Sequence, residues 1–319
     1  MGHDSNTRPI FRASSRVTLR ILVTGANGFV GSNLVPYLQA KDLEILRTDI
    51  DKSDINGDLT DPEFVNDSLG TKDFDAIVHL AGIVNIPKSL ADPYTCYKVN
   101  CFATLSLLNM AADKKVQRFV YASSNNVYGP PTRLPVKEDD PYDPRSPYDY
   151  SKVVSEHFVK SFHQHKNLPT VILRSWNLFG PNDQPTRVVP RFIKACLANE
   201  PIPLYNGGRD ADNFYHVSNY CEAVALAVNG QKAVGETFNV GTGQETTVRQ
   251  LAEMVKEITG SASRLQTLPP RTPLETRPRR TKPSIGKIRR VLGYKPVLAL
   301  RDGLEQTLEW YRKHPSRLA

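Results

Sequence analysis

The segment SPYDYSK, residues 146–152, contains the residue types best suited to proton transfer. Tyr148 and Lys152 are four positions apart and share one face of a helix, whereas Tyr150 points away from that face. A tyrosine has an ordinary pKa of about 10 and is a poor base at neutral pH, but a nearby lysine cation lowers that pKa. We therefore interpret Tyr148 and Lys152 as an acid–base pair for an alcohol or a ketone.

A second segment, ASSNNVYG (122–129), places two serines immediately before two asparagines. The side-chain amides of Asn125 and Asn126 have nearly the shape of carboxyl groups, but they cannot deliver or accept a proton near neutral pH. A reaction that requires an acid at these two positions is therefore disfavoured.

The segment TGANGFVG (24–31) has the spacing Gly25-x-x-Gly28-x-x-Gly31 between an expected strand and an expected helix. Glycines allow a tight turn, a close approach of a pyrophosphate to the backbone, and close packing of the helix on the sheet. The helix N-terminus then faces the phosphates. The motif predicts a dinucleotide site, because it lies in a strand–turn–helix context.

Asp49 ends the second expected strand, where a carboxylate can accept hydrogen bonds from ribose hydroxyls and repel a 2′-phosphate. This position favours NAD over NADP. Arg47 lies on the same expected face of the strand, and Asp51 is a competing candidate for the ribose contact. Asp58, in GDLTD (57–61), is placed where it can reach an adenine amino group.

Alternating strands and helices must position these residues. Apolar runs predict strands at 19–25, 43–49, 75–82, 117–124, 169–175 and 236–241, and helical spacing predicts helices at 29–41, 92–112, 147–165 and 247–259. This order predicts an α/β protein with a doubly wound parallel sheet. We expect a flexible tail at 1–18, a dinucleotide-binding domain at 19–177 to which segments near 214–240 return, and a smaller, mainly substrate-binding domain at 178–319.

The charge is uneven along the 319 residues. The 41 Lys and Arg against 33 Asp and Glu give +8, and residues 264–290 alone hold nine of the basic residues with one acid, Glu275. Such a stretch fits an anionic substrate, an acidic partner or a solvated surface, and we leave these open. We expect no nucleic-acid partner.

Composition is ordinary for a soluble protein, and the chain has no apolar run of about 18 residues and no secretory signal. The four cysteines form no CxxC pair, which favours a reducing cytoplasm. His163 and His165 fall on different helix faces, so no metal site is expected.

The motifs together resemble the extended short-chain dehydrogenase/reductase family, and in particular its nucleotide-sugar epimerases and dehydratases, including UDP-galactose 4-epimerases. The resemblance runs from about Leu19 to His314. It is carried, in order, by TGANGFVG, Asp49, GDLTDP, VHLAG, DPYTCYKVNCFATLSLL, SSNNVYG, SPYDYSK, LRSWNLFGP, FNVGTG and LGYKP…LRDGLEQTLEWY. It implies a Rossmann-type sheet, bound NAD, a nucleotide-sugar substrate and a homodimer built on two helices.

The resemblance also implies roles for individual residues. Ser124 hydrogen-bonds the reacting oxygen, Tyr148 is the acid and base, and Lys152 holds the nicotinamide ribose. Cofactor contacts are implied for Gly25, Asn27, Gly28, Phe29, Val30, Gly31, Asp49, Asp58, Leu59, Leu80, Ala81, Gly82, Asn100, Ser123, Tyr148, Lys152 and Trp176. Substrate contacts are implied for Ser124, Asn125, Asn177, Arg209, Arg277 and Arg280. His79 is interpreted as a packed strand-end residue.

In the family's 4,6-dehydratases, the two residues after the reactive hydroxyl are Asp and Glu, which move protons during loss of water. Decarboxylating members usually keep an acid there too. With Asn125 and Asn126 at these positions, the resemblance implies epimerisation, at C4, through a 4-keto intermediate. A keto-sugar-nucleotide reductase and a non-catalytic dinucleotide-binding member are the alternatives. The hexose and the nucleotide base are left open.

The chain departs from the family in two segments that meet the substrate diphosphate. DNFYHV (212–217) has Asp212 where UDP-galactose 4-epimerases have an arginine, and RPRR (277–280) keeps Arg277 but has Arg280 where they have an acid. We predict that Arg280 pairs with Asp212 and turns a guanidinium toward the phosphates. Arg209 is a second possible source of positive charge.

Overall fold

The computed structural model describes residues 18–270 and 278–318. Its centre is a seven-stranded sheet in the order β11-β6-β5-β4-β1-β2-β3, in which every neighbouring pair is parallel. The strands are β1 (Arg20–Thr24), β2 (Glu44–Asp49), β3 (Ile55–Asn56), β4 (Ala76–His79), β5 (Arg118–Ser124), β6 (Thr170–Ser175) and β11 (Thr237–Val240). The predicted strands are therefore present, and the last of them joins the sheet beside β6.

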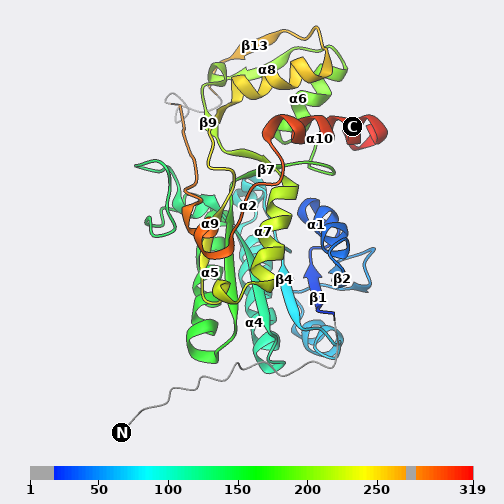
Figure 1. Ribbon diagram of the computed structural model, residues 1–319, viewed down its shortest axis with the longest axis vertical. Coiled ribbons are helices and arrows are strands. Elements are labelled where there is room, and N and C mark those ends of the chain that lie inside the picture. Colours follow the sequence, from blue (N-terminus) through cyan, green and yellow to red (C-terminus); the bar gives the residue numbers. More distant parts are fainter. Residues whose placement is uncertain (1–17, 271–277, 319) are drawn as a thin grey trace.

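Helices cover both faces of the sheet, as expected for a doubly wound fold (Figure 1). One face packs against α1 (Phe29–Gln39), α7 (Val217–Asn229) and α9 (Gly286–Leu292). The other packs against α4 (Ala103–Asp113) and α5 (Pro147–Lys166). The Rossmann-type fold class predicted from the sequence is confirmed.

A separate layer stands beyond one end of the sheet (Figure 1). Its core contains side chains of α6 (Val188–Leu197), α8 (Val248–Thr259) and α10 (Leu300–Lys313). Three short strand pairs accompany this layer and its junction with the sheet: β7 (Asn177–Phe179) with β10 (Phe214–His216), β9 (Ala211–Asp212) with β12 (Thr246–Thr247), and β8 (Ile202–Tyr205) with β13 (Leu265–Leu268).

The helix that carries Tyr148 and Lys152 begins and ends on local signals. Ser146 caps α5 by accepting a hydrogen bond from the Asp149 amide at 3.2 Å, and Pro147 occupies the first helical position. Asn167 ends the helix in the left-handed conformation, at φ 53°. The segment predicted as a helix over 92–112 is instead α3 (Pro93–Tyr97), a π-helical turn (Lys98–Phe102) and α4, joined end to end; the short α2 (Ile86–Ala91) precedes them.

Candidate active site

The site predicted from the sequence lies at the carboxyl ends of the parallel strands. The strand order reverses at β1, since β2 and β3 follow on one side while β4, β5 and β6 follow on the other. The loops after β1 and β4 therefore diverge, and this is where open α/β sheets bind their ligands.

The glycine turn is sterically restricted to glycine at its ends. Gly25 has φ +69°, and a Cβ atom added there would lie 2.7 Å from the Ala81 amide nitrogen. A Cβ added at Gly31 would lie 2.3 Å from the Gly25 carbonyl oxygen. Gly28 is the N-cap of α1, so the turn brings the first amides of that helix to the strand ends. Larger side chains would push the loop after β4 and α1 away from the turn.

Asp49, predicted to bind a ribose, lies beside this turn. Its Oδ2 accepts a hydrogen bond from the Asn27 amide at 2.8 Å, and its Oδ1 accepts one from the Ile50 amide at 2.8 Å. Arg47 forms an ion pair with Asp54 at 2.6 Å, so its charge is compensated there. The competing acid Asp51 is exposed and paired with Lys52 at 3.9 Å.

The other residues predicted to contact the adenine and nicotinamide ends of the cofactor differ in how far they are buried. Asp58 is exposed and caps its own turn by accepting a hydrogen bond from the Thr60 amide at 2.8 Å, and Leu59 is partly buried. Leu80, Ala81 and Gly82 form the loop after β4 and are partly buried.

Asn100 shapes the loop after β4. Its Oδ1 accepts a hydrogen bond from the Ile83 amide at 2.7 Å, and its Nδ2 donates to the Ile83 carbonyl at 3.0 Å and to Ser151 Oγ at 2.8 Å. A Cβ at Gly82 would lie 2.9 Å from Asn100 Oδ1 and 3.9 Å from Lys152 Nζ. Asn100 thus ties the loop to α5 beside Lys152.

Tyr148 and Lys152 both face inward from α5, with 7% and 5% of their surface exposed, respectively, while Tyr150 is 50% exposed. Ser124 lies near the Tyr148 phenol and acts to lower its pKa. The Lys152 ammonium donates to the Ala122 carbonyl at 2.8 Å and lies over the Tyr121 ring. The structure thus brings Ser124, Tyr148 and Lys152 together at the ends of β5 and α5.

The expectation that Lys152 and a bound nicotinamide together lower the pKa of Tyr148 stays a prediction. In the protein alone, burial raises the pKa of Tyr148 to about 12, while Ser124 and the charge of Arg187 act in the opposite direction. Burial also lowers the pKa of Lys152 to about 8, and its ammonium is directed to the Ala122 carbonyl.

A buried ion pair that sequence reasoning missed lies directly behind this triad. Glu156 and Arg174 are joined at 2.6 Å, with 0% and 2% of their side chains exposed. Ser123 donates to Glu156 Oε1 at 2.5 Å, so its hydroxyl faces this pair. Glu156 follows Lys152 by one helical turn on the same face of α5, and that spacing was the available signal.

His79 is a packed residue, as interpreted from the sequence. Its ring nitrogens are hydrogen-bonded to Thr24 Oγ1 at 2.7 Å and Thr104 Oγ1 at 2.9 Å. Burial lowers the pKa of His79 to about 3. Trp176 is also buried, and its Nε1 donates to Thr281 Oγ1 at 3.0 Å.

The predicted pairing of Arg280 with Asp212 is wrong. Arg280 forks onto Glu245, with both nitrogen–oxygen distances at 2.7 Å, and its side chain is 64% exposed. Asp212 is buried and accepts a hydrogen bond from Asn177 Nδ2 at 2.6 Å. The main chain of Arg280 bridges Ala211, but the side chain turns to the acid that precedes β12.

The other predicted phosphate-binding residues differ in their surroundings. Arg209 is exposed and donates to the carbonyl of Asn206 at 3.1 Å. Arg277 lies outside the described residues. Asn125 is buried beside Ser124, whose Oγ accepts a hydrogen bond from the Asn126 amide at 3.2 Å. Burial raises the pKa of Asp212 to about 6, which the charge of Arg279 partly opposes.

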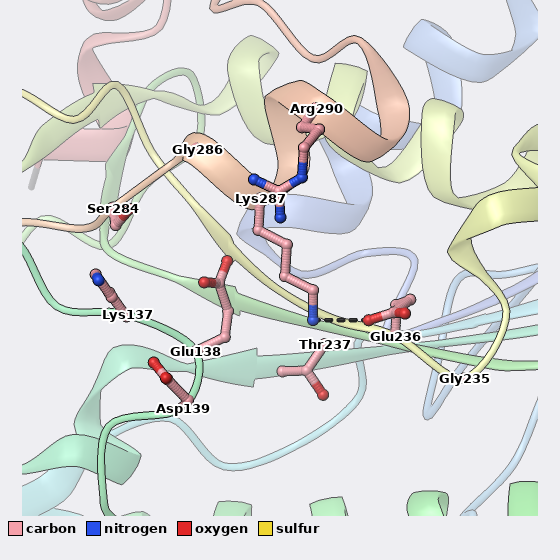
Figure 2. A pocket seen from close by; sticks show the side chains of 10 residues that line it. All are labelled: Lys137, Glu138, Asp139, Gly235, Glu236, Thr237, Ser284, Gly286, Lys287 and Arg290. Carbon is pink, nitrogen blue, oxygen red and sulfur yellow. Dashed lines mark ion pairs between the residues drawn. The ribbon is translucent and has the colours of Figure 1, made fainter.

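A cavity of about 510 Å³ opens away from these residues, between β11, α9 and the loop that follows β5 (Figure 2). It is lined by charged groups of both signs, and the Lys287–Glu236 ion pair, at 2.7 Å, lies within it. It shares no residue with the predicted site.

Across 18–270 and 278–318, no cluster of three or more His, Cys, Asp or Glu is arranged to hold a metal ion. In the same ranges, no helix combines the length and apolar character needed to cross a membrane.

Comparison with known proteins identifies relatives with the same architecture. The model of the NAD dependent epimerase/dehydratase family matches residues 21–241. A mouse dTDP-D-glucose 4,6-dehydratase is 30% identical over 92% of this chain and 89% of its own. The crystal structure of Thermotoga maritima UDP-glucose 4-epimerase with UDP-glucose is 28% identical and has a TM-score of 0.86 over 93% of this chain and 100% of that one.

A Streptomyces venezuelae dTDP-glucose 4,6-dehydratase with NAD bound is 30% identical and has a TM-score of 0.84, over 93% of this chain and 98% of that one. The similar proteins thus include both 4-epimerases and 4,6-dehydratases. The residues of the glycine turn and Asp49 fit NAD, which is present in such solved structures.

Proposed function

The chain belongs to the NAD dependent epimerase/dehydratase family, and from this premise we propose that it is an NAD-dependent nucleotide-sugar 4-epimerase. The observation that carries the proposal is the buried phenol of Tyr148 beside Ser124, which is followed in the chain by the amides of Asn125 and Asn126. The pair supplies an acid–base group for a sugar hydroxyl, and the amides supply no acid for loss of water.

The proposed reaction uses few groups of this chain. Tyr148 removes the proton of the C4 hydroxyl, and Ser124 hydrogen-bonds the reacting oxygen. NAD, when bound, accepts the hydride from C4 and later returns it. The 4-keto sugar turns over between these steps, so that the hydride is added to its other face and Tyr148 gives the proton back. Lys152 holds the nicotinamide ribose, and its ammonium is already fixed by the Ala122 carbonyl.

The choice of epimerisation over dehydration rests on Asn125 and Asn126. A 4,6-dehydratase needs groups that take a proton from C5 and give one at C6, whereas an epimerase needs none beyond the triad. Both positions belong to the short turn Asn125–Tyr128 that begins at Ser124. An amide in this turn contacts a sugar without exchanging protons with it.

We propose that the substrate is held mainly by residues of 178–319. Asn177 lies at the boundary with this part, and its amide is paired with Asp212. Asp212 stands where related epimerases have an arginine, so the diphosphate must meet its positive charge elsewhere. Arg209, Arg277 and Arg280 are the sequence-based candidates, and of these Arg280 is compensated by Glu245.

Product analysis tests this function. The purified protein is incubated with UDP-glucose, UDP-galactose and dTDP-glucose without added reductant, and the products are identified by NMR. Interconversion of hexoses that differ at C4, with NAD retained by the protein, supports the proposal. A 4-keto-6-deoxy product would identify a dehydratase, and stoichiometric use of NADH on keto sugars would identify a reductase.

We also propose that the protein is a homodimer. Large apolar side chains are exposed on adjoining parts of the α4 and α5 layer: Phe102 at 61%, Tyr150 at 50% and Val154 at 37%. Covering them with a second copy removes this surface from water. Light scattering should give the mass of a dimer for the wild type and of a monomer for the double variant Phe102→Ser/Val154→Ser.

A further inference from the structure

The strand β11 ends the sheet and presents main-chain groups to the cavity of Figure 2. Its inner side is used by β6: the Ile172 amide donates to the Glu236 carbonyl at 3.0 Å. Four residues further along, the Val240 carbonyl accepts from the Trp176 amide at 3.3 Å. In a parallel pair, the residues that alternate with these direct their amides and carbonyls to the opposite side. Thr237, which lines the cavity, therefore directs its main chain away from β6.

The next outward residue, Asn239, already has a partner on this open side. Its amide donates to Glu138 Oε1 at 2.9 Å, and its Nδ2 donates to the Val136 carbonyl at 3.0 Å. The loop after β5 thus takes the place of a neighbouring strand at Asn239. At Thr237, no corresponding hydrogen bond is formed within the described residues. A ligand with a main-chain amide and carbonyl fits the edge of the sheet at this point.

The walls of the cavity carry charges of both signs. Lys287 and Glu236 neutralise each other at 2.7 Å. Four more lining residues form no ion pair within the part of the chain that the structure describes: the cations Lys137 and Arg290 and the acids Glu138 and Asp139. A ligand that carries only one sign of charge is repelled by half of these groups, so the cavity favours a zwitterion.

Glu138 is fixed in position before any ligand binds. Its carbonyl accepts a hydrogen bond from Arg174 Nη1 at 3.0 Å, and its Oε1 is held by the amide of Asn239. Burial raises the pKa of this carboxyl, which the charges of Lys287 and Arg174 oppose only in part. An ammonium group placed beside Glu138 would compensate its charge at little cost in side-chain ordering.

We propose that this cavity binds a short peptide, a ligand that combines an ammonium group, a carboxylate and a peptide group. The ammonium group lies against Glu138 and Asp139. The carboxylate lies against Lys137 and Arg290, whose guanidinium binds it through two parallel hydrogen bonds. The peptide group between them meets the outward amide and carbonyl of Thr237. The volume of about 510 Å³ is that of a small-ligand site, and the site is independent of the reaction at Tyr148.

Isothermal titration calorimetry of the full chain with glycylglycine tests the proposal. Three probes each lack one feature: N-acetylglycine lacks the ammonium group, glycylglycinamide lacks the carboxylate, and 5-aminopentanoate keeps both charges at the same spacing without the peptide group. Glycylglycine should bind saturably and about tenfold or more tightly than each of the three. No saturable binding of glycylglycine, or an affinity within about twofold of it for any of the three probes, overturns the proposal.

Two variants show where the peptide binds. Glu138→Gln keeps an oxygen that accepts the Asn239 amide but removes the negative charge, and Arg290→Gln removes the guanidinium. Each should weaken glycylglycine binding about tenfold. Glu138→Gln should also bind N-acetylglycine more tightly than wild type, because an acid that repels this anion is gone; a misfolded variant would not show this gain.

Arg289→Gln is the matched control, since Arg289 is also an exposed arginine of α9 but does not line the cavity. It should bind glycylglycine as wild type does, and thermal melting without ligand reports on the folding of all variants. Wild-type affinity in both Glu138→Gln and Arg290→Gln, or an equal loss in Arg289→Gln, overturns the assignment of the peptide to this cavity.

Discussion

The most demanding prediction concerns the buried pair of Glu156 and Arg174. Glu156 accepts hydrogen bonds from Arg174 Nε at 2.9 Å and Nη2 at 2.6 Å, from Ser123 Oγ at 2.5 Å and from Tyr142 Oη at 2.7 Å. Although burial raises it, the pKa of Glu156 is held below its usual range by the Arg174 guanidinium. In the variant Glu156→Gln, an NH₂ group replaces one carboxylate oxygen, and this NH₂ group cannot accept hydrogen bonds.

The expected loss of stability follows from what remains buried. Arg174 keeps its charge with 2% of its side chain exposed, and its nitrogens then face an NH₂ group instead of a carboxylate. Removing one partner of a buried ion pair typically costs about 3–5 kcal/mol, because the other charge is left uncompensated. We expect the free energy of unfolding to fall by about this amount in Glu156→Gln.

Urea denaturation followed by circular dichroism measures this change. The control Glu257→Gln breaks the exposed ion pair with Arg301 and should change the unfolding free energy little. The double variant Glu156→Gln/Arg174→Met should be more stable than the sum of its single variants predicts, since it removes the unpaired charge. A loss of less than about 1 kcal/mol in Glu156→Gln, or simple additivity in the double variant, would refute the reasoning.

Three further predictions concern the site. Tyr148→Phe should lower turnover by roughly 10²–10⁴ and leave NAD binding intact, whereas Tyr150→Phe, at an exposed position, should keep full turnover; equal losses would contradict the helix-face assignment. Asp49→Ala should weaken NAD binding and narrow the preference over NADP in titrations, and a wild type that binds both equally would show that Asp49 does not discriminate. Asp212→Asn should raise the free energy of unfolding at pH 7 by up to about 3 kcal/mol. The reason is that the pKa of Asp212 is about 6 in the folded protein, higher than in the unfolded chain, so the buried carboxylate destabilises the fold at any pH above 6. This gain should shrink as the pH falls from 6 to 4, and denaturation at both ends of that range checks the sign.

Local patterns predicted the elements and the inward face of α5 well. The strands β1, β2, β4, β5, β6 and β11 lie within the predicted apolar runs, because buried parallel strands are short and apolar. The positions of Tyr148 and Tyr150 follow from helical geometry alone. His79 could be interpreted as a packed residue because it stands at the end of an apolar strand.

Side-chain partners far apart in the chain could not be predicted in the same way. Arg280 was expected to pair with Asp212, because Asp212 stands in place of a family arginine and Arg280 in place of a family acid. The turn before β12 instead places Glu245 beside Arg280. Arg187 carries no motif, and its place over Phe29 depends on the fold of the loop after β7. The pKa of Tyr148 depends on burial, which a spacing of four residues does not reveal.

The position of β11 at the edge of the sheet has a consequence for biosynthesis. Its partner β6 emerges from the ribosome long before Thr237–Val240 is made. The Tyr128 hydroxyl likewise lacks its acceptor, Asn239 Oδ1 at 2.7 Å in the folded protein, until this late strand is synthesised. Until then the nascent chain presents β6 as an open strand edge, a template for pairing with other chains. A fragment ending at residue 177 would keep that edge permanently. We therefore expect residues 19–177, cut out and expressed alone, to pair with other copies through the open edge of β6.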